Sequence, residues 1–184
     1  MLSENARKTL LDIARRTVDA VVRDEPAPEF DIRDAELCAR QGAFVTLRTH
    51  GNLRGCIGRF VADGPLWQIV HEMAVSSARE DPRFFGMQLR PEELSDLHIE
   101  ISVLSPLRRI RDPMEEVELG KHGIYIKQGV SSGCFLPQVA TETGWTKEQF
   151  LSHCCAGKAG LPPQAWKDPR TDVSVFTAEI IEEA

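Results

Sequence analysis

Two stretches of the chain repeat apolar residues every three or four positions, a spacing that predicts amphipathic helices. The first covers residues 3–22 and the second covers residues 65–79. Asp81-Pro82 ends the second helix, because proline lacks the N–H group that a continuing helix needs. Between the helices, the proline-rich EPAPEFD at 25–31 predicts an ordered loop.

Alternating apolar and polar residues predict strands in several other segments. Residues 43–49 and 53–60 form a hairpin through the turn HGN, and residues 98–105 form a strand that stops at a proline. A second hairpin spans residues 123–136 and turns at GVSSG, and the tail at 173–180 is a final strand. Strands in hairpins, together with helices of uneven length, indicate an α+β fold with an antiparallel sheet and flanking helices.

Length and composition are those of a globular domain. The 184 residues are 42% hydrophobic and 27% charged, which provides for a sizeable core. No apolar run is long enough to span a membrane, and the N-terminus lacks the uninterrupted apolar segment of a signal peptide. The net charge of −6 and the scattered basic residues argue against nucleic-acid binding. We therefore expect a cytoplasmic protein that binds neither membranes nor nucleic acids.

The five cysteines are expected to be free thiols. Their odd number and the lack of CxxC spacing are typical of a reducing compartment and match no zinc or iron–sulfur pattern. His153-Cys154-Cys155 looks like a metal tract, but Phe150 and Leu151 lie four residues before the two cysteines, which is the spacing of one helix face. We therefore expect both cysteines to pack in the core, with no metal site and no bound cofactor.

Cys56 is the first candidate for chemistry. It lies in NLRGCIGRF, residues 52–60, between two glycines. Because side chains alternate across a strand, Leu53 and Ile57 are expected to face the core, and Arg54 and Cys56 to face the opposite surface. A guanidinium beside a thiol favours the thiolate, so Arg54 would activate Cys56 as a nucleophile. The alternative is a small thiol that only packs in the strand.

Gly55 and Gly58 flank the thiol, and they let a ligand approach the backbone closely although they weaken the strand. Their N–H groups are able to hold an anion or a developing oxyanion. Arg83, in the DPRF motif that ends the second helix, is an anion anchor near the thiol in one interpretation. In the other, Asp81 and Arg83 bond to each other and to the local backbone. Both interpretations stay open.

A thiol nucleophile needs a general base, and the candidates for that role are Glu142, His122 and His153. Glu142 lies in PQVATET at 137–143, which predicts a short helix because proline suits a first turn. Gln138 lies four residues before Glu142, so both side chains share one helix face and Gln138 is a candidate ligand contact. A solvated helix face explains this pair equally well.

Several motifs in order along the chain resemble those of a known family. They read GAFVTL, NLRGCIGRF, AVSSAREDPRF, ISVLSPL, HGIYI and GCFLPQVATETGW. The chain resembles the AMMECR-domain family from about Leu10 to Phe176, and we expect a single domain over residues 1–184. The resemblance implies an α+β fold with a larger and a smaller lobe and a cleft between them. It also implies a Memo-like protein and a radical SAM protein as partners.

The family signature is matched here by Arg54, Gly55, Cys56, Gly58, Asp81, Arg83, Pro137, Gln138 and Trp145. Two hypotheses follow. In the first, the chain is an enzyme that uses Cys56 as a nucleophile or redox thiol. In the second, it is a non-catalytic binding or scaffold module whose cleft holds an anionic small molecule or a peptide, with Arg54 and Arg83 as anchors.

Overall fold

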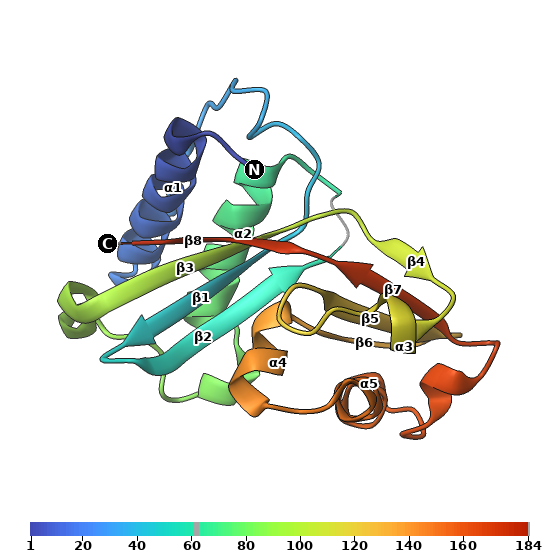
Figure 1. Ribbon diagram of the computed structural model, residues 1–184. Coiled ribbons are helices and arrows are strands. Elements are labelled where there is room, and N and C mark those ends of the chain that lie inside the picture. The colour runs from blue at the N-terminus through green and yellow to red at the C-terminus, as the bar shows by residue number, and fades with distance from the viewer. Residues whose placement is uncertain (61–62, 184) are drawn as a thin grey trace. The chain divides into compact units, whose positions relative to one another are not determined.

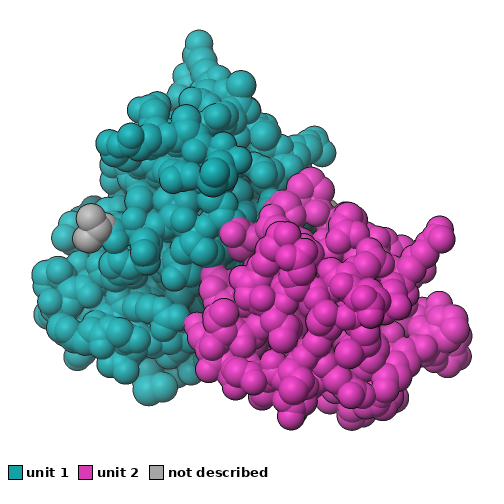
Figure 2. Space-filling view, viewed as in Figure 1, with its two compact units in different colours: residues 1–104, 179–184 teal, residues 105–178 magenta. Residues whose placement is uncertain are grey.

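The computed structural model describes residues 1–60 and 63–183. The chain divides into two compact units, which Figure 2 distinguishes by colour. Unit 1 consists of residues 1–104 and 179–184, and unit 2 consists of residues 105–178. Each unit has a sheet and an apolar core of its own.

Unit 1 is a four-stranded sheet with two helices on one face (Figure 1). The strand order is β2-β1-β3-β8. The strands are β1 (Ala43–Thr49), β2 (Asn52–Arg59), β3 (Leu97–Leu104) and β8 (Ala178–Glu182). The helices are α1 (Glu4–Val22) and α2 (Leu66–Arg79), with short 3-10 turns η1 (Pro82–Phe84) and η2 (Pro91–Asp96). Because β2 lies at one end of this order, its outer edge is open to contacts from loops and turns.

The two long helices confirm the apolar spacing seen in the sequence. Ser3 caps α1, and its hydroxyl accepts a hydrogen bond from the Ala6 N–H at 3.2 Å. Leu10 and Val18 of α1 are fully buried and share one core with Ile69 of α2. The apolar face of each helix therefore packs on the sheet, as an amphipathic helix requires.

The first hairpin turns at His50 and Gly51, whose φ angles are 49° and 78°. Two successive left-handed residues make the turn that matches the twist of paired strands. The turn sets Thr49 opposite Asn52, but the register shifts between Leu47 and Arg48. The uninterrupted alternation expected over residues 53–60 is therefore wrong, because a β-bulge inserts one extra residue into β2.

Unit 2 contains the second antiparallel sheet, with the strand order β4-β7-β5-β6. The strands are β4 (Arg108–Ile110), β5 (Gly123–Gln128), β6 (Ser131–Phe135) and β7 (Asp172–Phe176). The helices are α3 (Pro113–Glu116), α4 (Pro137–Thr143) and α5 (Lys147–Cys154), followed by the π-turn η3 (Cys155–Ala159) and the 3-10 turn η4 (Ala165–Lys167). Phe150 and Leu151 of α5 are fully buried in this core. The expected second hairpin is present, but its turn is only Gly129-Val130, because the SSG of GVSSG already pairs with β5 as part of β6.

The tail differs from the expected single strand over 173–180. It forms two strands, β7 and β8, which belong to different sheets. Thr177 separates them, since its N–H donates to the Ser105 hydroxyl and its carbonyl accepts from the Ser105 N–H, both at 2.9 Å. The apolar alternation continues across the break because Val175 packs in the core of unit 2 and Ile181 in that of unit 1.

Helices and antiparallel sheets in both units confirm the α+β fold class. Within the residues that the structure describes, every helix is too short or too polar to cross a bilayer.

Candidate functional site

Cys56 lies on β2 directly opposite Thr46 of β1. The neighbouring pair, Val45 and Ile57, packs with the core beneath the helices, so the Thr46–Cys56 pair is on the other face of the sheet. The Thr46 hydroxyl donates a hydrogen bond to Cys56 Sγ at 3.3 Å. Thr46 is buried and Cys56 is half-buried, so the thiol has a fixed polar neighbour and remains partly accessible.

The backbone of Cys56 is held at the outer edge of β2 by the DPRF motif. Asp81 accepts the Cys56 N–H at 2.9 Å, and Arg83 Nη2 donates to the Cys56 carbonyl at 3.0 Å. Arg83 also donates from Nε and Nη2 to the two Asp81 oxygens, at 2.9 and 2.6 Å. The structure thus shows the second interpretation of this motif, since Asp81 and Arg83 bond to each other and to the backbone of the strand that carries the thiol. The anion-anchor role of Arg83 stays a prediction.

The ion pair is asymmetric, because the Asp81 side chain is 2% exposed and the Arg83 side chain 54% exposed. Hydrogen bonds from Arg83 lower the pKa of Asp81 against the opposing effect of burial. The Asp81 carboxylate raises the pKa of Arg83, and the Cys56 side chain adds to that rise. Arg83 is therefore a cation held beside the backbone of the residue that carries the thiol.

Gly55 and Gly58 have packing roles that the sequence alone does not reveal. A Cβ on Gly55 would lie 2.0 Å from the Ser77 carbonyl oxygen of α2, and a Cβ on Gly58 would lie 2.1 Å from the Phe44 ring. Helix α2 and the Phe44 ring therefore occupy the space left free by the two missing side chains. The Gly58 N–H points to the same outer edge as the Cys56 N–H, because amide directions alternate along a strand.

Ser77 also replaces a bond of the sheet. The Ile57 N–H donates to the Ser77 hydroxyl at 2.9 Å, and that hydroxyl donates to the Val45 carbonyl at 2.8 Å. A helix side chain is thus inserted between the two strands beside the thiol. The N–H groups of Cys56 and Ile57 therefore both have side-chain acceptors.

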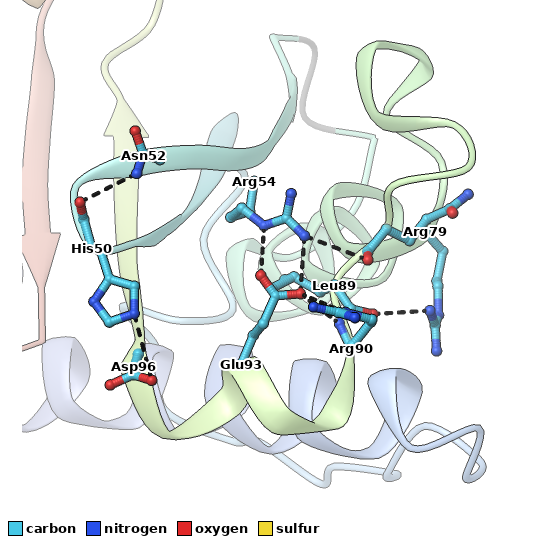
Figure 3. Close-up of polar contacts among 9 residues, drawn as sticks. His50, Asn52, Arg54, Arg79, Leu89, Arg90, Glu93 and Asp96 are labelled. Carbon is cyan, nitrogen blue, oxygen red and sulfur yellow. Dashed lines mark hydrogen bonds and ion pairs between the residues drawn. The ribbon is translucent and has the colours of Figure 1, made fainter.

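Arg54 occupies the bulge and turns to η2 (Figure 3). Its Nε and Nη2 donate to the two Glu93 oxygens, each at 3.0 Å, and Nη2 also reaches the Gln88 carbonyl at 3.5 Å. Across the described ranges 1–60 and 63–183, the Arg54 guanidinium makes no hydrogen bond to Cys56. Its expected role beside the thiol stays a prediction, and Arg83 is the arginine that reaches Cys56.

The proposed general bases lie in unit 2. His122 is buried, and its Nδ1 accepts the Glu118 N–H at 3.2 Å, which holds the turn before β5. His153 is exposed and stacks on Trp145 at a ring distance of 4.2 Å. Glu142 is exposed on α4. Each keeps its candidate role as a prediction.

Gln138, the predicted ligand contact of unit 2, is half-buried on α4.

Cys154 and Cys155 are fully buried, and burial raises the pKa of both thiols. The expectation that they pack in the core is therefore confirmed. Among the described residues, no three His, Cys, Asp or Glu side chains gather closely enough to hold a metal ion.

The family of the chain follows from comparison with known proteins. A family model named AMMECR1 matches residues 11–181, a range that includes elements of both units. The chain belongs to the AMMECR1 family.

Relatives in the AMMECR1 family cover nearly the whole chain. Protein TK0174 of Thermococcus kodakarensis is 42% identical over 184 residues, which cover 95% of this chain and 88% of that protein. Protein NEQ441 of Nanoarchaeum equitans is 42% identical over 180 residues, covering 95% of this chain and 98% of that protein. The crystal structure of uncharacterized protein PH0010 from Pyrococcus horikoshii matches with a TM-score of 0.89 at 38% identity, covering 99% of this chain and 93% of that chain.

Three residues of this AMMECR1-family site were not among the expectations from sequence: Thr46, Ser77 and Glu93. The hairpin expected around the three-residue turn HGN already places Thr46 opposite Cys56, and the structure reaches the same pairing with a two-residue turn and a bulge. Thr46 was missed because a threonine in a strand carries no sequence signal of a site residue. Ser77 reads as an ordinary small residue of a helix. Glu93 carries no sequence signal: it accepts the Arg90 backbone N–H at 3.1 Å, but an arginine is not the N-cap residue of a capping box.

Proposed function

We propose that the chain is a cysteine-dependent enzyme and that the Cys56 thiol is its nucleophile. The observation that carries this proposal is the double contact at Cys56, where the Thr46 hydroxyl donates to Sγ and Arg83 bridges the Cys56 carbonyl and Asp81. A hydroxyl donor and a nearby guanidinium are the two kinds of neighbour that stabilise a thiolate.

The site is also preorganised for covalent chemistry. Asp81 and Ser77 hold the backbone amides on either side of the thiol, so the sulfur keeps its position without a bound substrate. A packing cysteine needs neither a buried carboxylate behind its backbone nor a hydroxyl donor on its sulfur.

The reaction that fits these groups is displacement at an electrophilic carbon. A base takes the S–H proton, the sulfur forms a bond to carbon, and the leaving group departs with the electron pair and a proton. Water then cleaves the S–C bond and restores the thiol. The Gly58 N–H would donate to negative charge that develops on the substrate, and Glu142, His122 and His153 remain the candidate bases.

The alternative, a binding module whose cleft holds an anion or a peptide with Arg54 and Arg83 as anchors, has less support at the thiol, where only Arg83 contacts Cys56. Arg83 already directs three hydrogen bonds to Asp81 and the Cys56 carbonyl. An anion at this position would compete with a buried carboxylate for the same guanidinium.

The family resemblance supports a wider proposal about partners. We infer that the chain acts as AmmeMemoRadiSam system protein A, together with a Memo-like protein and a radical SAM protein. Co-purification of a tagged chain with each partner separately measures which of the two binds directly. Failure of both to co-purify would contradict this part of the proposal and leave the thiol chemistry to its own test.

The thiol chemistry is tested by competition between two cysteines of the same molecule. Cys38 is exposed and its Sγ donates to the Ile32 carbonyl at 3.4 Å, whereas Cys56 is half-buried. If access alone governed labelling by iodoacetamide at pH 7, Cys38 would react first. We expect Cys56 to react faster, as read by peptide mass spectrometry, because thiolate stabilisation outweighs its lower exposure.

Two variants test which neighbouring groups raise the labelling rate of Cys56. Thr46→Val removes the hydroxyl donor and Arg83→Gln removes the charge, so each is expected to slow labelling of Cys56 without changing that of Cys38. Arg33→Gln is the matched control, since Arg33 is 87% exposed and also pairs with an aspartate two residues away in sequence. If Cys56 stays unlabelled until urea unfolds the protein, the thiol is structural and the proposal is wrong.

A further inference from the structure

A cavity around Arg54 in unit 1 has an unusual charge. Its volume is about 490 Å³. The lining consists of Arg54, Arg79, Gly86, Met87, Gln88, Leu89 and Arg90. Every charged residue of this lining is an arginine, although the chain as a whole carries a net charge of −6. The cavity is therefore a local positive site on an acidic protein.

We propose that this cavity binds the oxyanion group, carboxylate or phosphoryl, of a small-molecule ligand. Guanidinium groups recognise both kinds of oxyanion through paired hydrogen bonds. The proposal concerns a site that does not include Cys56, and it stands whether or not the thiol is catalytic.

Arg54 is already oriented for such a ligand (Figure 3). Glu93 accepts from its Nε and Nη2, and the Arg54 side chain is only 18% exposed, so the guanidinium is held in one position. Its Nη1 makes no hydrogen bond to any residue that the structure describes. An incoming oxyanion would find a donor whose side-chain entropy has already been lost in folding.

Arg79 adds a second fixed charge. It is the last residue of α2, and its Nη2 donates to the Val21 and Val22 carbonyls at the end of α1, at 2.6 and 3.0 Å. Its Nη1 points to the Leu89 carbonyl in the cavity wall, at 3.5 Å. These bonds fix the guanidinium, so Arg79 contributes to the positive potential of the cavity without needing to move.

Arg90 is the most exposed of the three arginines. Its side chain is 74% exposed, and its contact with Glu93 is a loose one, at 3.6 Å from Nε. Three guanidinium groups thus face two carboxylates, those of Glu93 and of Asp24, which pairs with Arg79 at the surface. An anionic ligand would neutralise this excess positive charge, and the exposed Arg90 side chain has room to fold over the bound ligand.

The proposal is tested by titrating the full chain with inorganic phosphate and, separately, with citrate, at constant ionic strength in a calorimeter. We expect saturable binding of at least one of the two anions to one site per chain. Saturable binding of phosphate indicates a phosphoryl ligand, and saturable binding of citrate indicates a carboxylate ligand. Absence of saturable binding in both arms would overturn the proposal.

Variants locate the binding. Arg90→Gln is expected to weaken binding by about tenfold or more, because it removes a charge-assisted pair from an exposed side chain that the fold does not need. Arg33→Gln, which removes an exposed, carboxylate-paired arginine elsewhere, is expected to leave binding unchanged. Equal weakening in both variants would mean that binding depends on the net charge of the protein and not on this cavity, and would overturn the proposal.

Arg54→Lys supplies a second test that keeps the charge. Lysine loses the planar fork that pairs with Glu93 and the ligand, so binding is expected to fall although the net charge is the same. Urea unfolding verifies that this variant is folded. If Arg54→Lys is folded and binds the anion as tightly as the natural chain, Arg54 is not part of a ligand site.

Discussion

The two halves of β2 are held in place by different forces. Around Cys56, the backbone itself is fixed, through the Ser77 hydroxyl, the Asp81 carboxylate and the close approach of α2 to Gly55. Around Arg54, two residues earlier, the contact is made by a side chain, which pairs with Glu93. The first arrangement fixes the backbone that carries the thiol, while the second leaves an edge of the Arg54 guanidinium without a hydrogen bond to the described residues. The order of sensitivity to mutation is expected to follow this difference.

The largest effect is expected for Gly55→Ala. The added methyl group would lie 2.0 Å from the Ser77 carbonyl oxygen, a backbone atom that cannot turn aside, so α2 or β2 must shift. We expect a loss of about 3 kcal/mol in the free energy of unfolding, measured in urea. Gly157→Ala is the control, because nothing lies within 4 Å of its Cβ position. Equal stability of the two variants would contradict the close approach of α2.

A smaller loss is expected for Asp81→Asn. The amide keeps one acceptor oxygen but loses the charge that Arg83 and the Cys56 N–H both use. Because Arg83 is half exposed and water can solvate it, we expect a cost of about 2 kcal/mol, less than for a fully buried pair. Labelling of Cys56 should also change, because its strand is no longer held at this point. A stable variant with unchanged labelling would show that the clamp is dispensable.

Glu93→Gln tests the other half of β2 and is expected to cost about 1 kcal/mol, since both partners are partly exposed and water screens their attraction. Cys56 labelling should remain as in the natural chain. The comparison between the halves fails if this variant slows labelling as much as Asp81→Asn does.

Acid provides the mildest perturbation. Folding lowers the pKa of Asp81, mainly through Arg83, so its ionised form stabilises the folded state above the ordinary carboxyl pKa of about 4. This contribution is lost as the pH falls through the lowered value. The stability difference between the natural chain and Asp81→Asn should therefore shrink in urea titrations at successively lower pH below about 4. A difference that stays constant over that range would argue against a charged Asp81.

Periodicity alone accounts for most of the fold. The apolar stripe on α1 and the hairpin turn at His50-Gly51 both depend on local chemistry, which neighbouring residues specify. The single strand predicted over residues 173–180 was wrong, because Val175 and Ile181 follow one alternating pattern but pack in two different cores. Alternation records burial and does not say in which core a residue is buried.

The site was harder to predict, for a related reason. Residue type drew attention to Cys56 and Arg83, and the structure does bring these two together. The insertion of Ser77 depends on how α2 approaches the hairpin, which is a long-range contact. No local pattern in NLRGCIGRF distinguishes a glycine that admits a ligand from one that admits a helix.

The Ser77 hydroxyl has a consequence for the way the protein opens. The Ile57 amide hydrogen is bonded to a helix and not to the neighbouring strand, so it exchanges with solvent only when α2 moves off the sheet. Undocking of α2 and fraying of the β1–β2 hairpin are thereby joined in one cooperative event. The exchange rate of a single amide beside Cys56 thus reports how often the helix leaves its place.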